Sequence, residues 1–283
     1  PPEGERAAEW LRQFLAAHPE FDVLHLAYSH NLYRTARADG RPVVCTVHSD
    51  GYGWLAHEKC PDRLFCVSHS LGRWFENNLM RRPDIIVNGV DTHALAARRR
   101  QRTEAIGDRP YILWVGRWHP TKGTAVLERA WQTIQKYVPD AWLHVVGPGT
   151  SVAPNVTHFS QFVPPDDLAQ AYANADLLLH TSPFEGFGLV VAEAQAAGLP
   201  VVARNVCGVQ DIVVPGETGF LVPNGADEDE TAERLAQAVI HALGPGRKKL
   251  KAMGRAAAKR AKQEFSAERM AAEYEAAYRG LVE

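Results

Sequence analysis

Short apolar runs alternate with longer amphipathic stretches along the chain from Pro110 onward. Apolar runs of four or five residues are typical of buried strands, and stretches with apolar residues three or four apart are typical of helices. Alternation at this spacing predicts a parallel sheet with helices on both faces. The predicted strands are Tyr111–Val115, Trp142–Val146, Val156–Phe159, Asp176–His180 and Pro200–Ala203, and the predicted helices are Lys122–Tyr137, Pro165–Ala173, Leu189–Ala197 and Thr231–Leu243.

The segment before these elements repeats the same rhythm in a shorter series. Between the two series lies Ala94–Asp108 with the basic run Arg98–Arg102, which we interpret as an interdomain connection carrying solvated charge. The sequence therefore predicts an α/β protein of two domains, each with its own sheet. The first series consists of a helix at Glu5–Ala17 and strands near Phe21–Tyr28, Val43–Val47, Leu64–Val67 and Ile85–Val87.

Composition narrows the function classes. The 283 residues are 46% hydrophobic and 23% charged, which are ordinary globular values, and the longest apolar runs are too short to cross a bilayer. A net charge of −2 gives no reason to expect nucleic acid as a partner. The four cysteines form no ligand-like cluster, and Cys45 and Cys66 lie in apolar runs. Reduced buried thiols predict a cytoplasmic protein.

The segment Ser182–Glu193 combines a turn rich in glycine with two glutamates. It follows a predicted strand and opens a predicted helix, where free backbone N–H groups favour an anion. A carboxylate at Glu185 suits a neutral, hydroxyl-rich group, so a sugar joined to a diphosphate satisfies both demands. Glu193, one turn into the helix, is a candidate for holding a ribose; the alternative is an ordinary solvated helix residue.

Two cations follow the strand that opens the second series. Arg117 and Lys122 lie beyond Gly116, which lets the backbone turn, and they can neutralise a diphosphate whose charge grows as it leaves. Gly147-Pro-Gly149 is only a GxG and suggests close approach of a ligand to the backbone. The third glycine of a dinucleotide fingerprint is missing, which argues against NAD, and the absence of a Walker sequence disfavours P-loop ATPases and kinases.

Other charged and titratable residues have simpler interpretations. The acidic pairs at Asp166-Asp167 and Asp227–Glu230 stand at predicted helix starts, where acids are favoured, so no metal site is expected. His48 ends a predicted strand and is either a structural histidine or a residue that reaches the substrate. The basic segment Pro245–Glu264 predicts one or two helices with a cationic face, either solvated or bound to an anionic membrane surface.

The combination of motifs resembles the retaining glycosyltransferases of family 4. The resemblance is carried by Gly116-Arg117 with Lys122-Gly123, by Glu185 and Glu193 separated by seven residues, by Ala197–Ala203 and by Val214–Val222. In the first half, Thr46–His48, Val67-Ser68 and Asn88–Asp91 also match. The resemblance implies the GT-B fold of two facing Rossmann-like domains. It implies an N-terminal domain over 1–98, a nucleotide-sugar domain over 99–264, and a final helix over 265–283 that crosses back to the first domain.

The resemblance also implies roles for particular residues. Arg117 and Lys122 would hold the donor diphosphate, Glu185 the transferred sugar and Glu193 the ribose, and His48 would contact the donor sugar. Amides near Phe187, Gly188 and Leu189 would bind the distal phosphate, while Gly116 and Gly147 allow the ligand to approach. The segment Gln161–Val163, with Phe162 and Val163, would lie against the base.

The implied reaction is transfer of a sugar to an acceptor hydroxyl with retention and without a metal cofactor. An inverting route with His48 as base is the less favoured alternative. The acceptor, whether a glycan, a lipid-linked molecule or a small molecule, is not identified by the sequence, nor are the sugar and the base. The basic segment is also consistent with a protein bound at the inner membrane surface.

The resemblance is incomplete at the N-terminal side. Members of the family usually have another strand, a glycine-rich turn and further units before the segment that resembles Phe21–Tyr28. We therefore expect a shortened N-terminal domain, completed by a second chain or by a homo-oligomer, or active as a short form. Two further functions stay open: a non-catalytic subunit of a split glycosyltransferase, and a nucleotide-sugar epimerase of the same fold.

Overall fold

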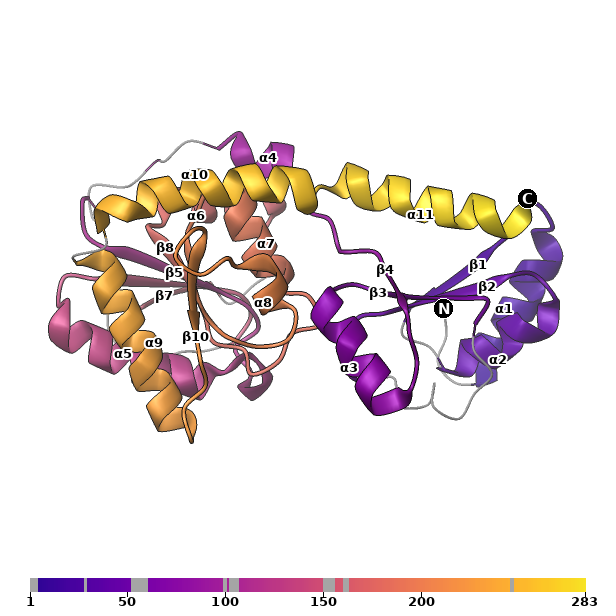
Figure 1. Ribbon diagram of the computed structural model, residues 1–283, viewed down its shortest axis with the longest axis horizontal. Helices are drawn as coiled ribbons and strands as arrows, with labels where there is room; N and C mark the ends of the chain where they lie inside the picture. The colour runs from indigo at the N-terminus through magenta and orange to yellow at the C-terminus, as the bar shows by residue number, and fades with distance from the viewer. Residues whose placement is uncertain are drawn as a thin grey trace. The chain divides into compact units, whose positions relative to one another are not determined.

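The computed structural model of the protein describes residues 5–27, 30–51, 61–98, 101, 107–149, 156–159, 163–244 and 247–283. It divides into two compact units. Unit 1 consists of Pro1–Asn88 with Glu268–Glu283, and unit 2 consists of Gly89–Ala267. Figure 1 shows both, with the chain coloured from indigo at the N-terminus to yellow at the C-terminus.

Unit 1 holds a parallel sheet whose strands follow one another in chain order, β1-β2-β3-β4. Adjacent residues of β2 point to opposite faces, as in any strand. Val43 packs with Leu11, Leu15 and Tyr33 of the two N-terminal helices, and Val44 packs with residues of the last helix. The elements are α1 (Glu5–Ala17), β1 (Leu24–Ala27), α2 (His30–Asp39), β2 (Val43–Val47), β3 (Arg63–Cys66), α3 (His69–Leu79), β4 (Asp84–Ile85) and α11 (Ala267–Val282).

Helix α11 contributes an aromatic and aliphatic face to unit 1. Tyr274 and Tyr278 pack with Phe65 of β3, and His25 of β1 lies between the two hydroxyl groups of Tyr278 and Thr46, at 2.6 and 2.7 Å. The C-terminal helix therefore covers one face of this sheet, while α1 and α2 cover the other.

Unit 2 holds a parallel sheet in the order β10-β9-β8-β5-β6-β7. The chain runs from β5 outward to β6 and β7, then returns to pair β8 with the other edge of β5. The order reverses between β5 and β8, which makes the carboxyl ends of these two strands a topological switch point. The strands are β5 (Tyr111–Val115), β6 (Trp142–Val146), β7 (Val156–Phe159), β8 (Leu177–His180), β9 (Val201–Arg204) and β10 (Gly219–Val222).

Helices pack on this sheet because their apolar faces match its buried strands. Leu127, Trp131 and Ile134 of α5 are fully buried and join Leu235 and Val239 of α9 in the main core. Helices α5 and α9 are in contact and lie side by side (Figure 1). The helical elements of unit 2 are α4 (Thr92–Ala96), η2 (Pro120–Lys122), α5 (Thr124–Tyr137), α6 (Pro165–Asn174), α7 (Leu189–Ala196), α8 (Val209–Ile212), α9 (Glu228–Leu243) and α10 (Arg247–Glu264).

The α/β class and the five strands predicted in unit 2 are confirmed, three of them to the residue, while β10 was not predicted. Two helix starts were wrong. Helix α9 begins at Glu228 instead of Thr231, with Asp227 as its N-cap. Helix α5 begins at Thr124 instead of Lys122, because Pro120–Lys122 form a 3-10 turn and Gly123 adopts the left-handed conformation (φ 70°). The predicted connection Ala94–Asp108 also begins inside helix α4. This helix packs against α7 and α10, so unit 2 starts at Gly89, earlier than the expected boundary at residues 98 and 99.

Candidate active site

Three loops of unit 2 leave the carboxyl ends of β5, β6 and β8 around the switch point. The loop after β5 carries Gly116, Arg117 and Lys122, and the loop after β6 begins at Gly147. The two loops nearly touch: a Cβ at Gly147, where φ is 141°, would lie 1.9 Å from the carbonyl oxygen of Gly116. Glycine at 147 is thus required by backbone packing, beside any role in ligand approach.

Thr181 joins the loop after β8 to the loop after β5. Its hydroxyl accepts from the indole N–H of Trp114 and donates to the carbonyl of Lys122, both at 2.9 Å. A Cβ at Gly123 would lie 2.1 Å from the carbonyl oxygen of Thr181, so the two backbones are in close contact. The buried guanidinium of Arg204, at the end of β9, donates to the same carbonyl. These contacts hold the two loops together where they leave β5 and β8.

Lys122 and Glu185 form an ion pair across the switch point. Lys122 Nζ lies 2.7 Å from Glu185 Oε1, with side-chain exposures of 29% and 17%. His180, the last residue of β8, places Nε2 3.5 Å from the same oxygen. Burial alone would raise the pKa of Glu185, but the hydrogen bonds and charges of His180 and Lys122 outweigh it and hold the pKa at about 2. Glu185 is therefore an anion at every ordinary pH.

Sequence reasoning missed His180, although a polar residue at the end of a buried apolar strand was a usable signal. Its side chain is 6% exposed, and Nδ1 is buried without a hydrogen-bond partner among the described residues. The contacts of His180 and of Lys122 with Glu185 both converge on Oε1. No described residue hydrogen-bonds to Oε2, which leaves one carboxylate oxygen available to a ligand hydroxyl.

Glu193 is partly buried on helix α7, rather than an ordinary solvated helix residue. The hydroxyl of Tyr172 donates to its Oε2 at 2.7 Å, and burial raises the pKa of Glu193 against the lowering effect of that hydrogen bond. Burial and the Glu193 charge also raise the pKa of Tyr172 well above its usual range. Tyr172 comes from α6 and was not predicted from the sequence. It orients the carboxylate and leaves Oε1 for other partners.

Gly188 is the N-cap of α7; it is left-handed (φ 102°) and provides no side-chain cap. The free amides of the helix can therefore receive an anion. Leu189 is 48% exposed, whereas Phe187 is buried against the ring of Phe265. Phe187 can contribute only its backbone to a ligand. Arg117 is exposed, and no carboxylate among the described residues pairs with it.

The other predicted residues come from elsewhere in the sequence. Val163 precedes α6 and is half-buried, while Phe162 and Gln161 lie outside the described residues. His48 follows β2 in unit 1 and is half-buried, and burial lowers its pKa.

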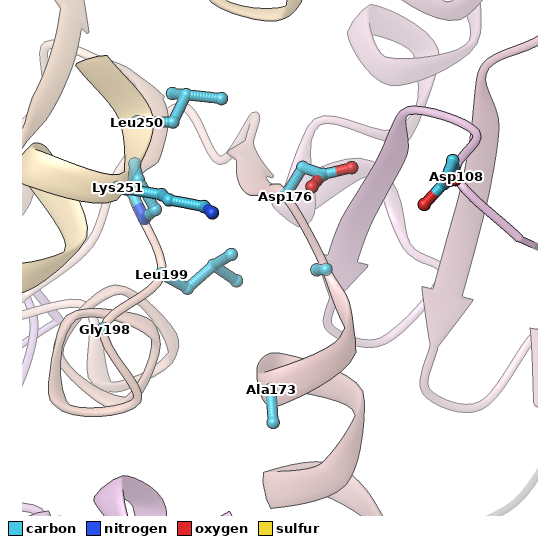
Figure 2. A pocket seen from close by; sticks show the side chains of 9 residues that line it. Asp108, Ala173, Asp176, Gly198, Leu199, Leu250 and Lys251 are labelled. Carbon is cyan, nitrogen blue, oxygen red and sulfur yellow. The ribbon is translucent and has the colours of Figure 1, made fainter. Parts of the chain in front are cut away.

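A separate hollow lies at the opposite ends of the unit 2 strands. It has a volume of about 560 Å³ and is lined by Asp108, Asp176, Leu199 and Lys251, among others (Figure 2). Asp176 immediately precedes β8, and its carboxylate accepts from the amide of Tyr111, which begins β5. In open α/β sheets ligands bind beyond the carboxyl ends of the strands, so the hollow is on the wrong side for the predicted site.

Acidic residues considered as metal ligands have structural roles. Asp166 and Asp167 lie in the first turn of α6, and Asp227 caps α9 by accepting from the amide of Glu230 at 2.8 Å. Within the described residues, no three His, Cys, Asp or Glu side chains gather as a metal site would require. The same part of the chain contains no helix long and apolar enough to span a membrane.

The fold and site define a GT-B type protein, with parallel sheets in two units and, at the switch point of the second sheet, a lysine paired with an ionised glutamate. The chain belongs to the family Glycosyl transferases group 1, whose pattern it matches over residues 97–260. Residues 1–94 match Glycosyltransferase Family 4. The resemblance noted from the motifs is thus confirmed.

Two curated relatives are 31% and 37% identical to this chain over the residues that align. It is 31% identical over 266 residues to phosphatidyl-myo-inositol mannosyltransferase of Mycobacterium tuberculosis, covering 84% of this chain and 67% of that protein. It is 37% identical over 188 residues to D-inositol 3-phosphate glycosyltransferase of Segniliparus rotundus, covering 60% of this chain. The chain spans only 40% of the length of that second protein.

Solved structures share the fold at lower identity. HepE of Anabaena in complex with UDP has a TM-score of 0.80 at 18% identity, covering 96% of this chain and 82% of that one. Sucrose-phosphate synthase of Thermosynechococcus elongatus has a TM-score of 0.76 at 23% identity, covering 96% and 77%.

Proposed function

We propose that this protein transfers a sugar from a nucleotide-diphosphate sugar to an acceptor hydroxyl, with retention at the anomeric carbon and without a metal cofactor. The observation that carries the proposal is the Lys122–Glu185 pair at the switch point, beside the uncapped start of α7. It brings a cation, free amides and an ionised carboxylate to one place within unit 2.

The cations and amides account for the diphosphate. Arg117 is exposed and Lys122 is only partly buried, so both can reach a bound anion. The amides that follow Gly188 receive the distal phosphate, favoured by the positive end of the helix dipole. As the sugar–phosphate bond breaks, negative charge grows on the diphosphate, and these fixed groups stabilise it most at that moment.

The carboxylates account for the neutral parts of the donor. Glu185 is held ionised, and its Oε2 can accept hydrogen bonds from sugar hydroxyls. Glu193 is oriented by Tyr172 and takes the ribose hydroxyls through its other oxygen. The nucleobase of the donor lies against the segment that includes Val163. Backbone groups of that segment distinguish one base from another.

The reaction follows from leaving-group stabilisation. The bond between the anomeric carbon and the phosphate oxygen breaks, and the acceptor oxygen forms the new bond on the same face. The acceptor proton passes to the departing phosphate oxygen, so no protein nucleophile is required. His48 is proposed to contact the donor sugar; this role rests on the family resemblance, and loss of donor affinity in His48→Ala would support it.

The curated relatives direct the choice of acceptor. Their names describe transfer to D-inositol 3-phosphate and to phosphatidyl-myo-inositol, both of which are phosphorylated inositols. We therefore propose a phosphoinositol hydroxyl, free or lipid-linked, as the acceptor class. Mannose is the sugar to test first, because the second name specifies a mannosyltransferase.

The experiment is to follow sugar transfer by NMR with GDP-mannose or a UDP-sugar and myo-inositol phosphate or phosphatidylinositol. Formation of a product with the donor's anomeric configuration supports the proposal. Lys122→Ala should lower kcat on the order of 10²–10³-fold, as loss of a charge-stabilising contact does. Inversion, or a requirement for added divalent metal, would overturn the corresponding part of the proposal.

A partner-dependent subunit is the second candidate. Among the described residues, β1 is an edge strand of the unit 1 sheet, paired only with β2. Open edges accept a further strand from another chain. Light scattering that shows a stable active monomer would exclude this candidate. Conversion of a UDP-sugar into its epimer without acceptor would instead support the epimerase alternative.

A further inference from the structure

Helix α10 carries a row of cations that no described residue neutralises. Lys248, Lys251, Arg255, Lys259 and Lys262 follow one another three or four residues apart, which places them along one side of the helix. All five are exposed. None forms an ion pair with a side chain in the described part of the chain.

The row is unusual within this molecule. Three other surface helices pair an exposed arginine with a carboxylate one turn away, as in Arg12–Glu9 of α1, Arg234–Glu230 of α9 and Arg279–Glu275 of α11. The same helix α10 pairs Arg260 with Glu264, outside the row. Within the row, like charges stand at the spacing where they repel each other. Helix stability therefore does not account for the pattern.

The first turn of α10 also carries charges that destabilise the helix. Its first turn contains no acidic residue and instead carries Lys248 and Lys249, although the positive end of the helix dipole disfavours cations there. Helices α6 and α9 place acidic residues at the same position. Both the repulsion along the row and the cations in the first turn destabilise helix α10. This arrangement points to an anionic partner outside the chain.

The orientation of the row is fixed by the opposite face of the helix. Leu250, Met253, Ala257 and Ala261 are buried, and a Cβ at Gly254 would lie 2.1 Å from the carbonyl oxygen of Gly198. This close contact with the loop after α7 leaves helix α10 little freedom to rotate about its axis. From Lys248 to Lys262 the row extends about 21 Å at 1.5 Å per residue. Lys251 also borders the hollow of Figure 2, and a row of this length can face a flat surface along the helix.

We propose that this row is an electrostatic docking surface for an anionic lipid bilayer. The inference rests on the proposed function, since it would bring the protein to a lipid-linked acceptor. Four of the five residues are lysine, and no aromatic side chain stands between them to stack on bases, which disfavours single-stranded nucleic acid. The exposed residues of α10 outside the row are Lys249, Ala252, Gln263 and Glu264. None of them is a large apolar residue, so the helix rests on the headgroups without inserting.

The test is co-sedimentation of the full chain with vesicles of phosphatidylcholine, with and without phosphatidylglycerol. The wild type should bind only the anionic vesicles, and binding should fall as salt is raised. The variant combining Lys248→Gln, Arg255→Gln and Lys259→Gln should bind on the order of 100-fold more weakly, because each cation near an anionic surface contributes about fivefold.

A charge-matched control separates the row from overall charge. The variant combining Arg12→Gln, Arg129→Gln and Arg279→Gln removes three exposed cations from other helices and should bind vesicles like the wild type. Equal binding to neutral vesicles, equal weakening in both variants, or preferred binding to an oligonucleotide would overturn the proposal. Thermal stabilisation by nucleotide sugars, measured on the same samples, reports on the donor site independently, so failure of the proposed function would be recognised separately.

Discussion

At the scale of single residues, the ionised state of Glu185 depends on its two neighbours. Its folded pKa of about 2 lies below the ordinary value of 4.5, so the pairing stabilises the folded state fully above pH 4.5. That stabilisation decreases as the pH falls toward 2. A shift of this size corresponds to roughly 3 kcal/mol.

We therefore predict that Glu185→Gln lowers the free energy of unfolding at pH 7 and that the difference from wild type shrinks between pH 4.5 and pH 2. Denaturant unfolding of both proteins across this range is the measurement. A difference that stays constant with pH would show that the carboxylate is not held by charge.

His180 is predicted to position Glu185 rather than to contact the reacting atoms. His180→Phe keeps an aromatic ring but removes the nitrogen 3.5 Å from Oε1, so the pKa of Glu185 should rise and donor affinity should fall about 10-fold. His180→Gln retains a donor group and should recover part of the affinity. A change in protein stability alone, with an unaltered pH profile of donor binding, would contradict this role.

At the scale of elements, the close approach of the loops after β5 and β6 gives a sharp test. Gly147→Ala must relieve a contact of 1.9 Å with backbone and a positive φ, whereas Gly216→Ala meets only a positive φ of 78° with open space around it. We expect Gly216→Ala to cost about 1–2 kcal/mol and Gly147→Ala to cost more and to weaken donor binding. Thermal unfolding and donor titration of both variants measure this; equal costs would argue against the tight loop contact.

The elements also show why some structure was predictable from the sequence. Strands such as Leu177–His180 are buried along their whole length, so they can be predicted from an unbroken apolar run in the sequence. Strand β10 and helices α2 and α3 were missed, because β10 is half-exposed and the two helices mix polar residues into their apolar pattern. Lys122 and Glu185 were found through their motifs. His180 and Tyr172 were not, since their importance arises only when distant segments meet.

At the scale of the whole molecule, each unit has its own parallel sheet and core, and helix α11 returns the end of the chain to unit 1. The proposed donor-binding groups Arg117, Lys122, Glu185 and Glu193 all come from unit 2. We therefore predict that donor recognition depends chiefly on unit 2, and that binding of the acceptor and of an anionic surface depends on other residues.

The measurement that tests the central claim most directly is thermal stabilisation of the full chain across UDP-, GDP-, ADP- and TDP-sugars. One nucleotide class should stabilise the wild type, by about 2.7 kcal/mol when the donor is at 100 times its Kd. Lys122→Ala should lose most of this effect, and Lys136→Ala, which removes an exposed lysine of α5, should retain it. No stabilisation by any donor, or equal stabilisation of the Lys122→Ala variant, would contradict the assignment of the switch point as the nucleotide-sugar site.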